Sequence, residues 1–237
     1  MFKWLCAAAI AGSLALPAVS VAGQYGDVQV VTGGPSSENV FQLTSSSTPG
    51  PGWAGVYQDF TAAPITLSSI TTLSTDYQMT IGPIFGGAPR FSLIDSSNNE
   101  AWIYFGIPQA DGSFTDANGG AWGSTGNYAD LGSLDARVQS NGFGGYNSGY
   151  PPITWADFVG HVGGVGVNYV SLDLDGGWGA GPAGQRMLVD NFAVNGNVMS
   201  APGGAVPEPA AWTLMILGFG GVGAVLRRRA RAAALAA

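Results

Sequence analysis

Carboxylates are the commonest ionisable side chains in this sequence. Fourteen of them, against only three arginines, lie between Asp27 and Asp190, so this stretch carries a net charge of −11. Carboxylates, amides and turn carbonyls could together supply the roughly six to eight oxygen ligands that calcium takes. Alternatively, they shape turns and stay solvated. The charge makes cations or neutral polymers better partners than nucleic acid, whose phosphates require clustered Lys and Arg.

Aromatic side chains are the second candidate, because an exposed Trp or Tyr can stack its face on a sugar ring while neighbouring polar groups bind the hydroxyls. Trp122 lies in the loop "GGAWGSTGNY" and Trp178 in the loop "DGGWGAGPAGQ". These two tryptophans are therefore the candidate glycan-binding residues. Trp102, in the apolar run "AWIYFGI", is instead expected in the core.

Catalytic motifs are not found in this sequence. His161 is the sole histidine, no G-x-S-x-G motif accompanies it, and the only cysteine, Cys6, lies near the N-terminus. A Ser-His-Asp triad or a zinc site is therefore not expected, and no pair of carboxylates stands out for glycoside hydrolysis. The sequence predicts a protein that is not itself an enzyme.

Short runs with strand character, separated by turn residues, fill the centre of the chain. The expected strands are 27–32, 39–43, 55–60, 66–73, 77–81, 90–94, 101–107, 167–174 and 187–194. The motif "VSLDLD" alternates strictly, which places Val170, Leu172 and Leu174 on one face and Ser171, Asp173 and Asp175 on the other. Such a pattern is typical of an all-β sandwich with two sheets over one core.

One short helix is expected in "TWADFVGHVGG". Thr154 can cap it, with Asp157 at the third helical position, and the Gly163-Gly164 pair can end it. Its apolar side chains, Trp155, Phe158, Val159 and Val162, then form one stripe that packs on the sandwich.

The two ends of the chain look like targeting signals. Residues 1–22 combine a lysine, an apolar run and the small residues Ser20-Val21-Ala22, which is the layout of a secretory signal peptide with its helix and cleavage site. Residues 210–226 hold no charge and are almost long enough for a transmembrane helix. The arginines that follow would stop it at the cytoplasmic side, leaving the domain outside: Arg227, Arg228, Arg229 and Arg231.

The C-terminal end orders three elements: Val206-Pro207-Glu208-Pro209, then Trp212 with the run "LMILGFGGVGAVL", then "RRR". This order resembles the PEP-CTERM sorting signal of Gram-negative bacteria. The resemblance implies that a membrane-embedded exosortase recognises Pro207, Glu208 and Pro209 and removes the helix and arginines, after which the protein is released or attached at the outer surface. The two prolines would keep this segment extended. The residues "ARAAALAA" extend beyond the usual abrupt end of such signals.

Ice binding is a minor alternative, because this C-terminal signal is also catalogued as the C-terminal domain of ice-binding proteins. An ice-binding face asks for a flat, regular array of threonines. The stretch "TLSSITTLST" at 66–75 is rich in threonine, but it is not repeated elsewhere in the chain.

The centre carries a second resemblance, through "GVYQDF", "GGAPRFSLID" and a final "MLVDNFAVNG" preceded by "VSLDLDGG". These motifs are similar to jelly-roll modules of the galactose-binding-like class, which include extracellular carbohydrate-binding modules. In such modules a structural calcium commonly joins an acidic residue near the first strand to an aspartate in the last. By order in the chain, the resemblance implies Glu38 and Asp190 as the metal ligands.

Together these patterns predict a signal peptide (1–22), a jelly-roll-like β-sandwich with one short helix (23–199), a Pro/Gly-rich tether (200–209), a transmembrane helix (210–226) and a basic cytoplasmic end (227–237). Signal peptidase and exosortase would process the chain, which crosses the inner membrane and reaches the cell surface or extracellular matrix. The expected role is structural or adhesive. The alternative is an extracellular carbohydrate-binding module with a polysaccharide partner.

Overall fold

The computed structural model describes residues 21–36, 38–45, 52–84, 88–109, 114–132, 136–175 and 184–202. The expected sorting motif, transmembrane span and arginines all lie outside the described residues. The signal segment also does, except that Val21 and Ala22 already belong to the first strand. The expected cleavage site thus falls at the start of this strand.

The described residues form mostly short strands. The strands are β1 (Val21–Thr32), β2 (Asn39–Ser45), β3 (Trp53–Asp59), β4 (Ile65–Thr66), β5 (Leu73–Ile81), β6 (Arg90–Asp95), β7 (Glu100–Tyr104), β8 (Ile107–Pro108), β9 (Phe114–Thr115), β10 (Gly123–Ser124), β11 (Arg137–Asn141), β12 (Ile153–Thr154), β13 (Gly166–Asp175), β14 (Gln185–Val194) and β15 (Asn197–Met199). The helical elements are η1 (Leu67–Ser69), η2 (Phe143–Gly145) and α1 (Trp155–Val162).

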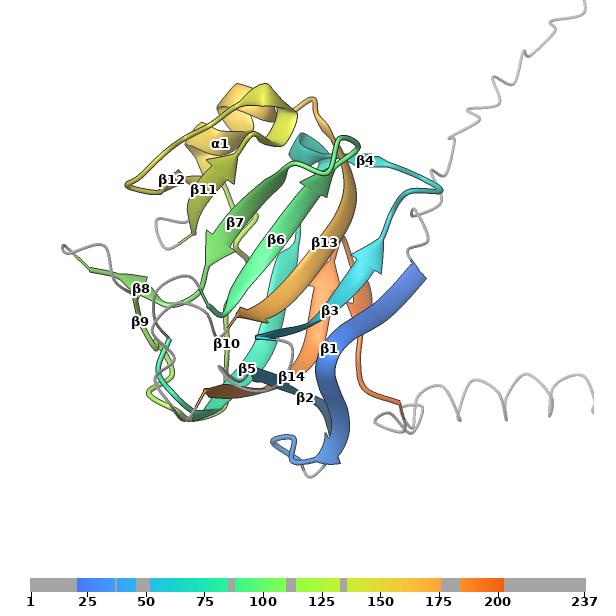
Figure 1. Ribbon diagram of the computed structural model, residues 1–237, viewed down its shortest axis with the longest axis vertical. Helices are drawn as coiled ribbons and strands as arrows, with labels where there is room; N and C mark the ends of the chain where they lie inside the picture. The colour runs from blue at the N-terminus through green and yellow to red at the C-terminus, as the bar shows by residue number, and fades with distance from the viewer. Residues whose placement is uncertain are drawn as a thin grey trace, which may run out of the picture.

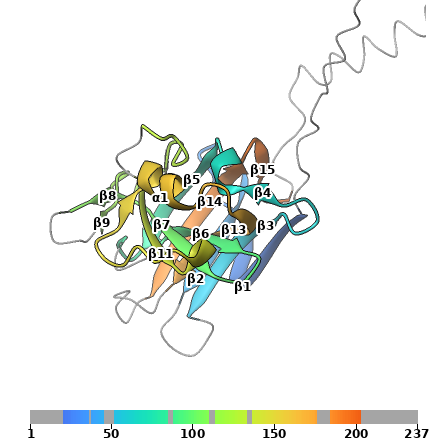
Figure 2. The same ribbon diagram turned by 90° about the horizontal axis from the view of Figure 1, so that it is seen from above.

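Two antiparallel layers form the domain (Figures 1 and 2). The front sheet has the order β3-β13-β6-β7-β11-β12, with β4 beside β13, and the back sheet has the order β10-β5-β14-β2, with β15 beside β14. Strand β1 belongs to both, because its first half pairs with β3 and its second half with β2. The chain is therefore the all-β, jelly-roll-like sandwich that the sequence predicts.

Gly26 lies where β1 passes from one sheet to the other. Its φ is +72°, a left-handed conformation that glycine adopts without cost. A Cβ at this position would lie 2.2 Å from the backbone oxygen of Trp53. The change of sheet therefore depends on a residue without a side chain.

The core between the layers is aromatic as well as aliphatic. Phe91 of β6 stacks on Phe192 of β14 with ring centroids 5.8 Å apart, which joins the two sheets directly. Phe105 and Tyr128 pack around Phe91. The alternation of β13 holds as predicted, since Val170, Leu172 and Leu174 are fully buried in this core.

The expected helix is confirmed as α1. The Thr154 side chain accepts a hydrogen bond from the Asp157 backbone N–H, and Gly163 follows the last helical residue. Trp155, Phe158 and Val162 are buried, while Val159 packs against the core from its edge. The apolar stripe of the helix thus covers one end of the sandwich beside β11 and β12 (Figure 1).

Three details of the sequence prediction are wrong. Residues 66–73 do not form one strand, because Leu67 and Ile70 enter the core three residues apart through the 3₁₀ turn η1. The strand expected at 101–107 ends at Tyr104, since Gly106 turns the chain with a φ of +89°. Trp102 is half-buried instead of core, because Ala101 and Ile103 occupy the inner face of β7.

Candidate functional site

The outer face of the front sheet, called the front face below, is built from alternate residues of its strands. The register places Tyr25 of β1, Gly55 of β3, Asp173 of β13 and Arg90 of β6 side by side across the sheet. Two residues earlier on β13, the neighbouring level carries Tyr57, Ser171 and Ser92. Because side chains alternate along a strand, all these groups point to the same side.

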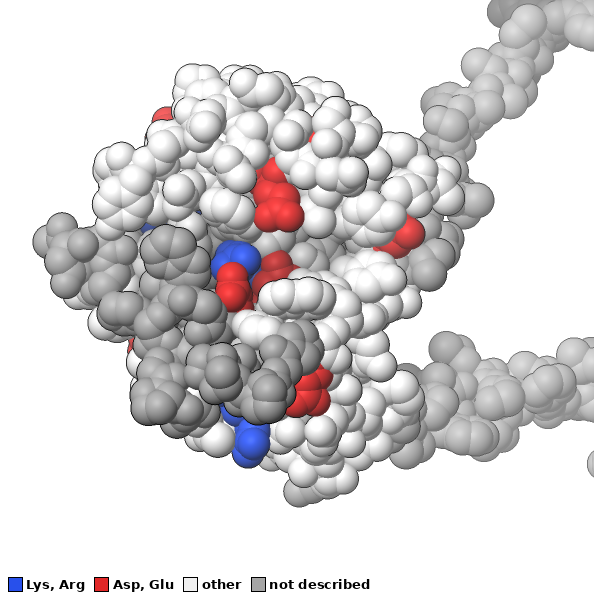
Figure 3. All heavy atoms as spheres, viewed as in Figure 1, with Lys and Arg blue, Asp and Glu red and all other residues white. Residues whose placement is uncertain are grey.

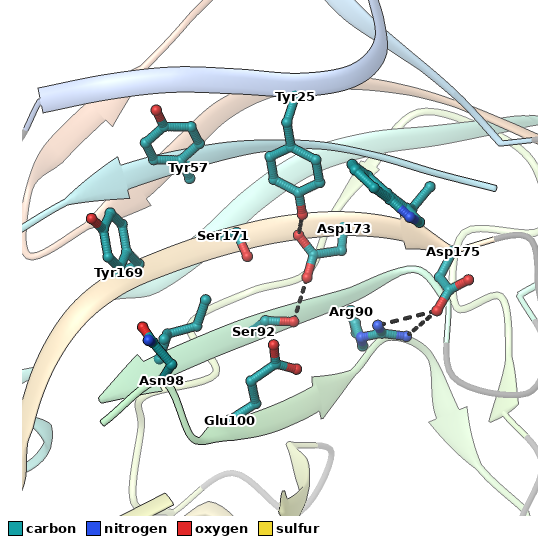
Figure 4. A pocket seen from close by; sticks show the side chains of 12 residues that line it. Tyr25, Tyr57, Arg90, Ser92, Asn98, Glu100, Tyr169, Ser171, Asp173 and Asp175 are labelled. Atoms are coloured by element: carbon teal, nitrogen blue, oxygen red, sulfur yellow. Dashed lines mark hydrogen bonds and ion pairs between the residues drawn. The ribbon is translucent and has the colours of Figure 1, made fainter. Parts of the chain in front are cut away.

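Gly55 lets the side chain of Tyr25 cross β3. A Cβ on Gly55 would lie 2.5 Å from the Tyr25 hydroxyl oxygen and 2.6 Å from Cζ of the same ring. The Tyr25 ring therefore occupies the space that a side chain on β3 would fill. This placement lets its hydroxyl donate a hydrogen bond to Asp173 on the far side of β3 (Figure 4).

Four aromatic rings form one wall of the front face. Tyr25 lies between Trp53 and Tyr57, with centroid distances of 5.4 and 6.3 Å, and Tyr57 makes an edge contact of 6.1 Å with Tyr169. Trp53 is 51% exposed, which is unusual for so large an apolar side chain. Exposed aromatic surface of this kind often marks a binding site.

A buried carboxylate forms the floor beside this wall. Asp173 is only 6% exposed and accepts hydrogen bonds from the hydroxyls of Tyr25 and Ser92. Burial raises the pKa of Tyr25 far above its ordinary value of 10.0, and the negative charge of Asp173 raises it further. Tyr25 therefore stays a neutral hydroxyl donor at any physiological pH.

The opposite wall comes from β6, β7 and the turn between them. Arg90 forms an ion pair with Asp175 at 3.2 Å, and its guanidinium also lies over the Trp102 ring, 5.4 Å from the centroid. The Trp102 indole N–H donates a hydrogen bond of 2.8 Å to Glu100. Arg90 is thus held between a carboxylate and an aromatic face.

Between the two walls lies an open cleft of about 420 Å³. Its lining includes three carboxylates and one guanidinium: Glu100, Asp173, Asp175 and Arg90. Ser92, Asn98 and Ser171 add neutral polar groups. Figure 3 shows acidic side chains gathered around a basic one in a hollow over the front sheet, and Figure 4 shows them converging. The cleft combines aromatic faces with fixed polar groups, as small-molecule and sugar sites do.

Of the two tryptophans singled out by the sequence, only Trp122 is described, and it lies outside the cleft. Trp122 is half-buried, and its indole N–H donates a hydrogen bond of 3.1 Å to the carbonyl of Gly33 in the turn between β1 and β2. This turn folds over the outer face of the back sheet, because a Cβ on Gly33 would lie 3.3 Å from Leu188 of β14. Trp178 lies outside the described residues.

The suggested metal ligands also lie away from the cleft. Asp190 is on the outer face of the back sheet, with its Oδ1 buried and without a hydrogen-bond partner. Burial raises its pKa, the Asn191 N–H and the Ser200 hydroxyl lower it, and the charges of Glu38 and Asp76 raise it again. Among the described residues, no three His, Cys, Asp or Glu side chains lie close enough together to hold a metal ion.

Two further candidates are also placed by the structure. His161 is an exposed residue of α1 and stacks on Tyr146 with a centroid distance of 4.3 Å. The threonine-rich stretch 66–75 is interrupted by η1, and its last threonine, Thr75, is buried. This stretch therefore does not present the flat threonine array that an ice-binding face needs.

The sequence did not single out the cleft itself. A signal for its floor was present, since the alternation of "VSLDLD" places Ser171, Asp173 and Asp175 on one face, and the front face is where they lie. No local pattern joins them to Tyr25 or Trp53, which arrive from strands more than a hundred residues earlier.

Comparison with known proteins identifies one motif in the chain. Residues 205–229 match the PEP-CTERM protein-sorting motif. No curated protein matches the chain. In the described part of the chain, every helix is too short or too polar to span a membrane.

Several solved structures resemble the domain. One is the family 11 carbohydrate-binding module of the cellulosomal cellulase Lic26A-Cel5E of Clostridium thermocellum, at 12% identity and a TM-score of 0.38, covering 77% of this chain and 87% of that one. Another is the xyloglucanase domain of NopAA, a type three effector from Sinorhizobium fredii, in complex with cellobiose, at 18% identity and a TM-score of 0.31, covering 76% of this chain and 99% of that one.

An exo-β-agarase is a third, at 12% identity and a TM-score of 0.35, covering 76% of this chain and 23% of the agarase. The chain thus spans about a quarter of that enzyme. The sorting motif indicates where the protein is sent, which the fold alone does not. This protein carries a PEP-CTERM sorting motif, which marks it for exosortase processing, export and sorting to the cell surface or extracellular space.

Proposed function

We propose that the domain binds an extracellular polysaccharide in the cleft of the front face. The observation that carries the proposal is the row of four aromatic rings, with Trp53 half exposed, facing a floor and wall of carboxylates and hydroxyls. Sugar rings present apolar C–H faces and polar rims. A site that recognises them therefore needs aromatic faces and fixed hydrogen-bonding groups together, and the cleft supplies both.

Preorganisation supports binding in this cleft. Asp173 is already held by two hydroxyl donors, and Arg90 by Asp175 and the Trp102 ring. Side chains fixed in this way lose little conformational entropy when a ligand binds, so more of the contact energy appears as affinity. On an exported and sorted protein, such a cleft would attach the domain to envelope or matrix polysaccharide, which is an adhesive role.

Binding without hydrolysis is the form of this proposal. Glycoside hydrolysis uses two carboxylates, one as acid and one as base or nucleophile. In the cleft, Asp175 is engaged by Arg90 and Asp173 accepts from two hydroxyls, which leaves Glu100 as the carboxylate with an oxygen open to a ligand. Incubation of the protein with bound polysaccharide should release no new reducing ends.

A glycan array probed with the purified full chain tests the proposal. Saturable binding is expected, and Trp53→Ala should weaken it at least about tenfold, because large aromatic residues carry much of the binding energy of an interface. Tyr169→Ala tests the other end of the aromatic wall. Trp122→Ala is the matched control, since Trp122 is a half-buried tryptophan outside the cleft. Absence of binding to every polysaccharide on the array would refute the proposal.

A structural calcium ion near Asp190 is a second candidate, which one observation favours. The Oδ1 atom of Asp190 is buried without a hydrogen-bond partner, and the charge of Glu38 is close enough to raise the pKa of Asp190. A bound cation would supply the missing partner and reverse that electrostatic cost. Glu38 and Asp190 would hold it, together with backbone or amide oxygens. Thermal unfolding with calcium and with chelator tests this candidate, and an unchanged midpoint would remove it.

A further inference from the structure

The charges of the cleft do not balance, and this imbalance restricts the ligand. Three carboxylates face one guanidinium, and that guanidinium is used by Asp175. Asp173 forms no ion pair with any described residue, although it is almost fully buried. Its bonds come only from the neutral hydroxyls of Tyr25 and Ser92. No ion pair with a described residue therefore compensates the carboxylate of Asp173 at the floor of the cleft.

Glu100 adds a second negative charge on the opposite wall. One of its oxygens accepts the Trp102 indole N–H, which is neutral, and the other has no hydrogen-bond partner among the described residues. With Asp175 neutralised by Arg90, the cleft therefore presents two uncompensated carboxylates. A uronic acid or a sulfated sugar placed here would bring like charges together at short range in a partly desolvated space, where repulsion is strong.

A cation is already held in this cleft by the protein itself. The Arg90 guanidinium lies between the Asp175 carboxylate and the face of Trp102. Asp173 and Glu100 offer a second set of carboxylates, and the rings of Tyr57 and Tyr169 line the same space with no cation of the described residues over them. A carboxylate and an aromatic face, the two groups that hold Arg90, are thus also available to a cationic group of a ligand.

We propose that the cleft prefers glycans carrying free amino groups, such as polymers of deacetylated amino sugars, over neutral and anionic glycans. This inference rests on the proposed glycan-binding function and specifies its substrate class. A protonated amine on a sugar ring provides a compact positive charge for the open oxygen of Glu100, and the negative charge of Asp173 on the floor adds to the attraction. The sugar ring itself supplies the apolar face for the aromatic wall. The excess negative charge of the domain attracts the same ligand at longer range.

Matched ligands test the preference on the unmodified full chain. Calorimetry would compare a glucosamine hexamer, its fully N-acetylated form, a glucose hexamer and a galacturonate hexamer. The amino form is expected to bind at least about tenfold more tightly than its acetylated form, since acetylation removes one charge-assisted contact per site. The advantage should shrink as salt rises from 50 to 500 mM, roughly as screening predicts. The uronate should bind weakest.

The other outcomes are equally informative. Equal binding of the amino, acetylated and glucose hexamers would overturn the amino preference and leave glycan binding intact. Tightest binding of the uronate would overturn the preference as well. Binding to none of the four, together with an empty glycan array, would overturn the preference and the proposed function with it.

A single charge removal locates the effect in the cleft. Glu100→Gln keeps the size of the side chain and its ability to accept the Trp102 N–H, so it should fold normally. It is expected to lower the preference for the amino hexamer about threefold or more while changing the affinity for the glucose hexamer less. Asp130→Asn removes the same charge from an exposed loop and should change neither. An equal effect of the two variants would show that only the overall charge matters, and would overturn a preference located in the cleft.

Discussion

The two outer faces of the sandwich differ in what covers them. On the front face, Trp53 and three tyrosines stand open to solvent or line a cleft over the sheet. On the back sheet, the turn between β1 and β2 folds over the strands, and Trp122 fastens that turn through its bond to Gly33. Trp53 therefore belongs to an open surface, whereas Trp122 helps to cover the back sheet.

The strands beneath explain this difference. Beneath the turn, the back sheet presents two apolar side chains outward, since Val40 and Leu188 lie on its outer face and are both buried. Apolar groups in this position need a cover, and the turn and its tryptophan provide it. The front sheet presents mostly Ser, Asp and Arg outward from β13 and β6, and these polar side chains need no cover. On the front face, an aromatic side chain such as Trp53 is not needed to cover apolar residues and can bind a ligand instead.

A substitution at Gly55 should produce the largest effect. In Gly55→Val, the added side chain would meet the Tyr25 ring and lie 2.8 Å from the backbone oxygen of Leu172 at its Cβ. Because both strands would have to shift, we expect a loss of about 1–3 kcal/mol in the free energy of unfolding and loss of glycan binding. Urea denaturation measures the first and calorimetry the second.

Gly160 supplies the control for this prediction. It lies in α1, and a Cβ there would meet nothing within 4 Å. Gly160→Ala should therefore stabilise the protein by up to about 1 kcal/mol through helix propensity, with glycan binding unchanged. If Gly55→Val left both stability and binding intact, the front face would not depend on the passage of Tyr25 over β3.

The two tryptophans should separate stability from binding. Trp122→Ala removes the bond to Gly33 and part of the cover of the back sheet, so it should lower the free energy of unfolding by about 1–2 kcal/mol. Trp53→Ala removes a half-exposed ring and should change stability by less than about 0.5 kcal/mol. The effects on glycan affinity should have the opposite order: Trp53→Ala should weaken binding, and Trp122→Ala should leave it unchanged. If Trp122→Ala reduced affinity as much as Trp53→Ala, the contrast between the faces would be wrong.

The sequence predicted the elements better than the site. Strict alternation in "VSLDLD" and the cap pair Thr154 and Asp157 are local signals, and both were confirmed. Residues 66–73 misled because Leu67 and Ile70 look equally apolar in a strand and in a 3₁₀ turn. Trp102 misled because an apolar run hides which residues face inward. Only the register of β7 against β6 and β11 decides this.

The cleft could not be found from local patterns, because its parts meet only in the sheet. Tyr25 and Asp173 are 148 residues apart and touch because a glycine separates them on β3. The sequence pointed to tryptophans in glycine-rich loops because such loops are usually exposed. Trp122 instead helps to cover the back sheet through its bond to Gly33. The useful signal was the polar half of "VSLDLD", which places Ser171, Asp173 and Asp175 together on the outer face of β13.

The smallest expected effect concerns Asp190 on the back sheet, where charge lies under a cover instead of in a cleft. In chelator, its raised pKa means that the folded protein binds the proton more tightly than the unfolded chain does. The contribution of Asp190 to stability is then fully present below its ordinary pKa of 3.8 and is lost as pH rises through the folded value. Above the folded pKa, the buried carboxylate is charged, and this charge destabilises the fold. Asp190→Asn removes the charge, so it should raise the melting midpoint slightly at pH 7 but not at pH 3.

Calcium should reverse the sign of this effect. A cation held by Glu38 and Asp190 would stabilise the charged carboxylate, so Asp190→Asn would lose a ligand and melt lower than the unmodified protein in excess calcium. Melting curves of both proteins at pH 7, in chelator and in calcium, give the four midpoints that decide it. Asp130→Asn, which removes an exposed charge, should show no such reversal. If Asp190→Asn were the more stable protein in both conditions, the buried oxygen of Asp190 would be a cost of the back sheet and not a metal ligand.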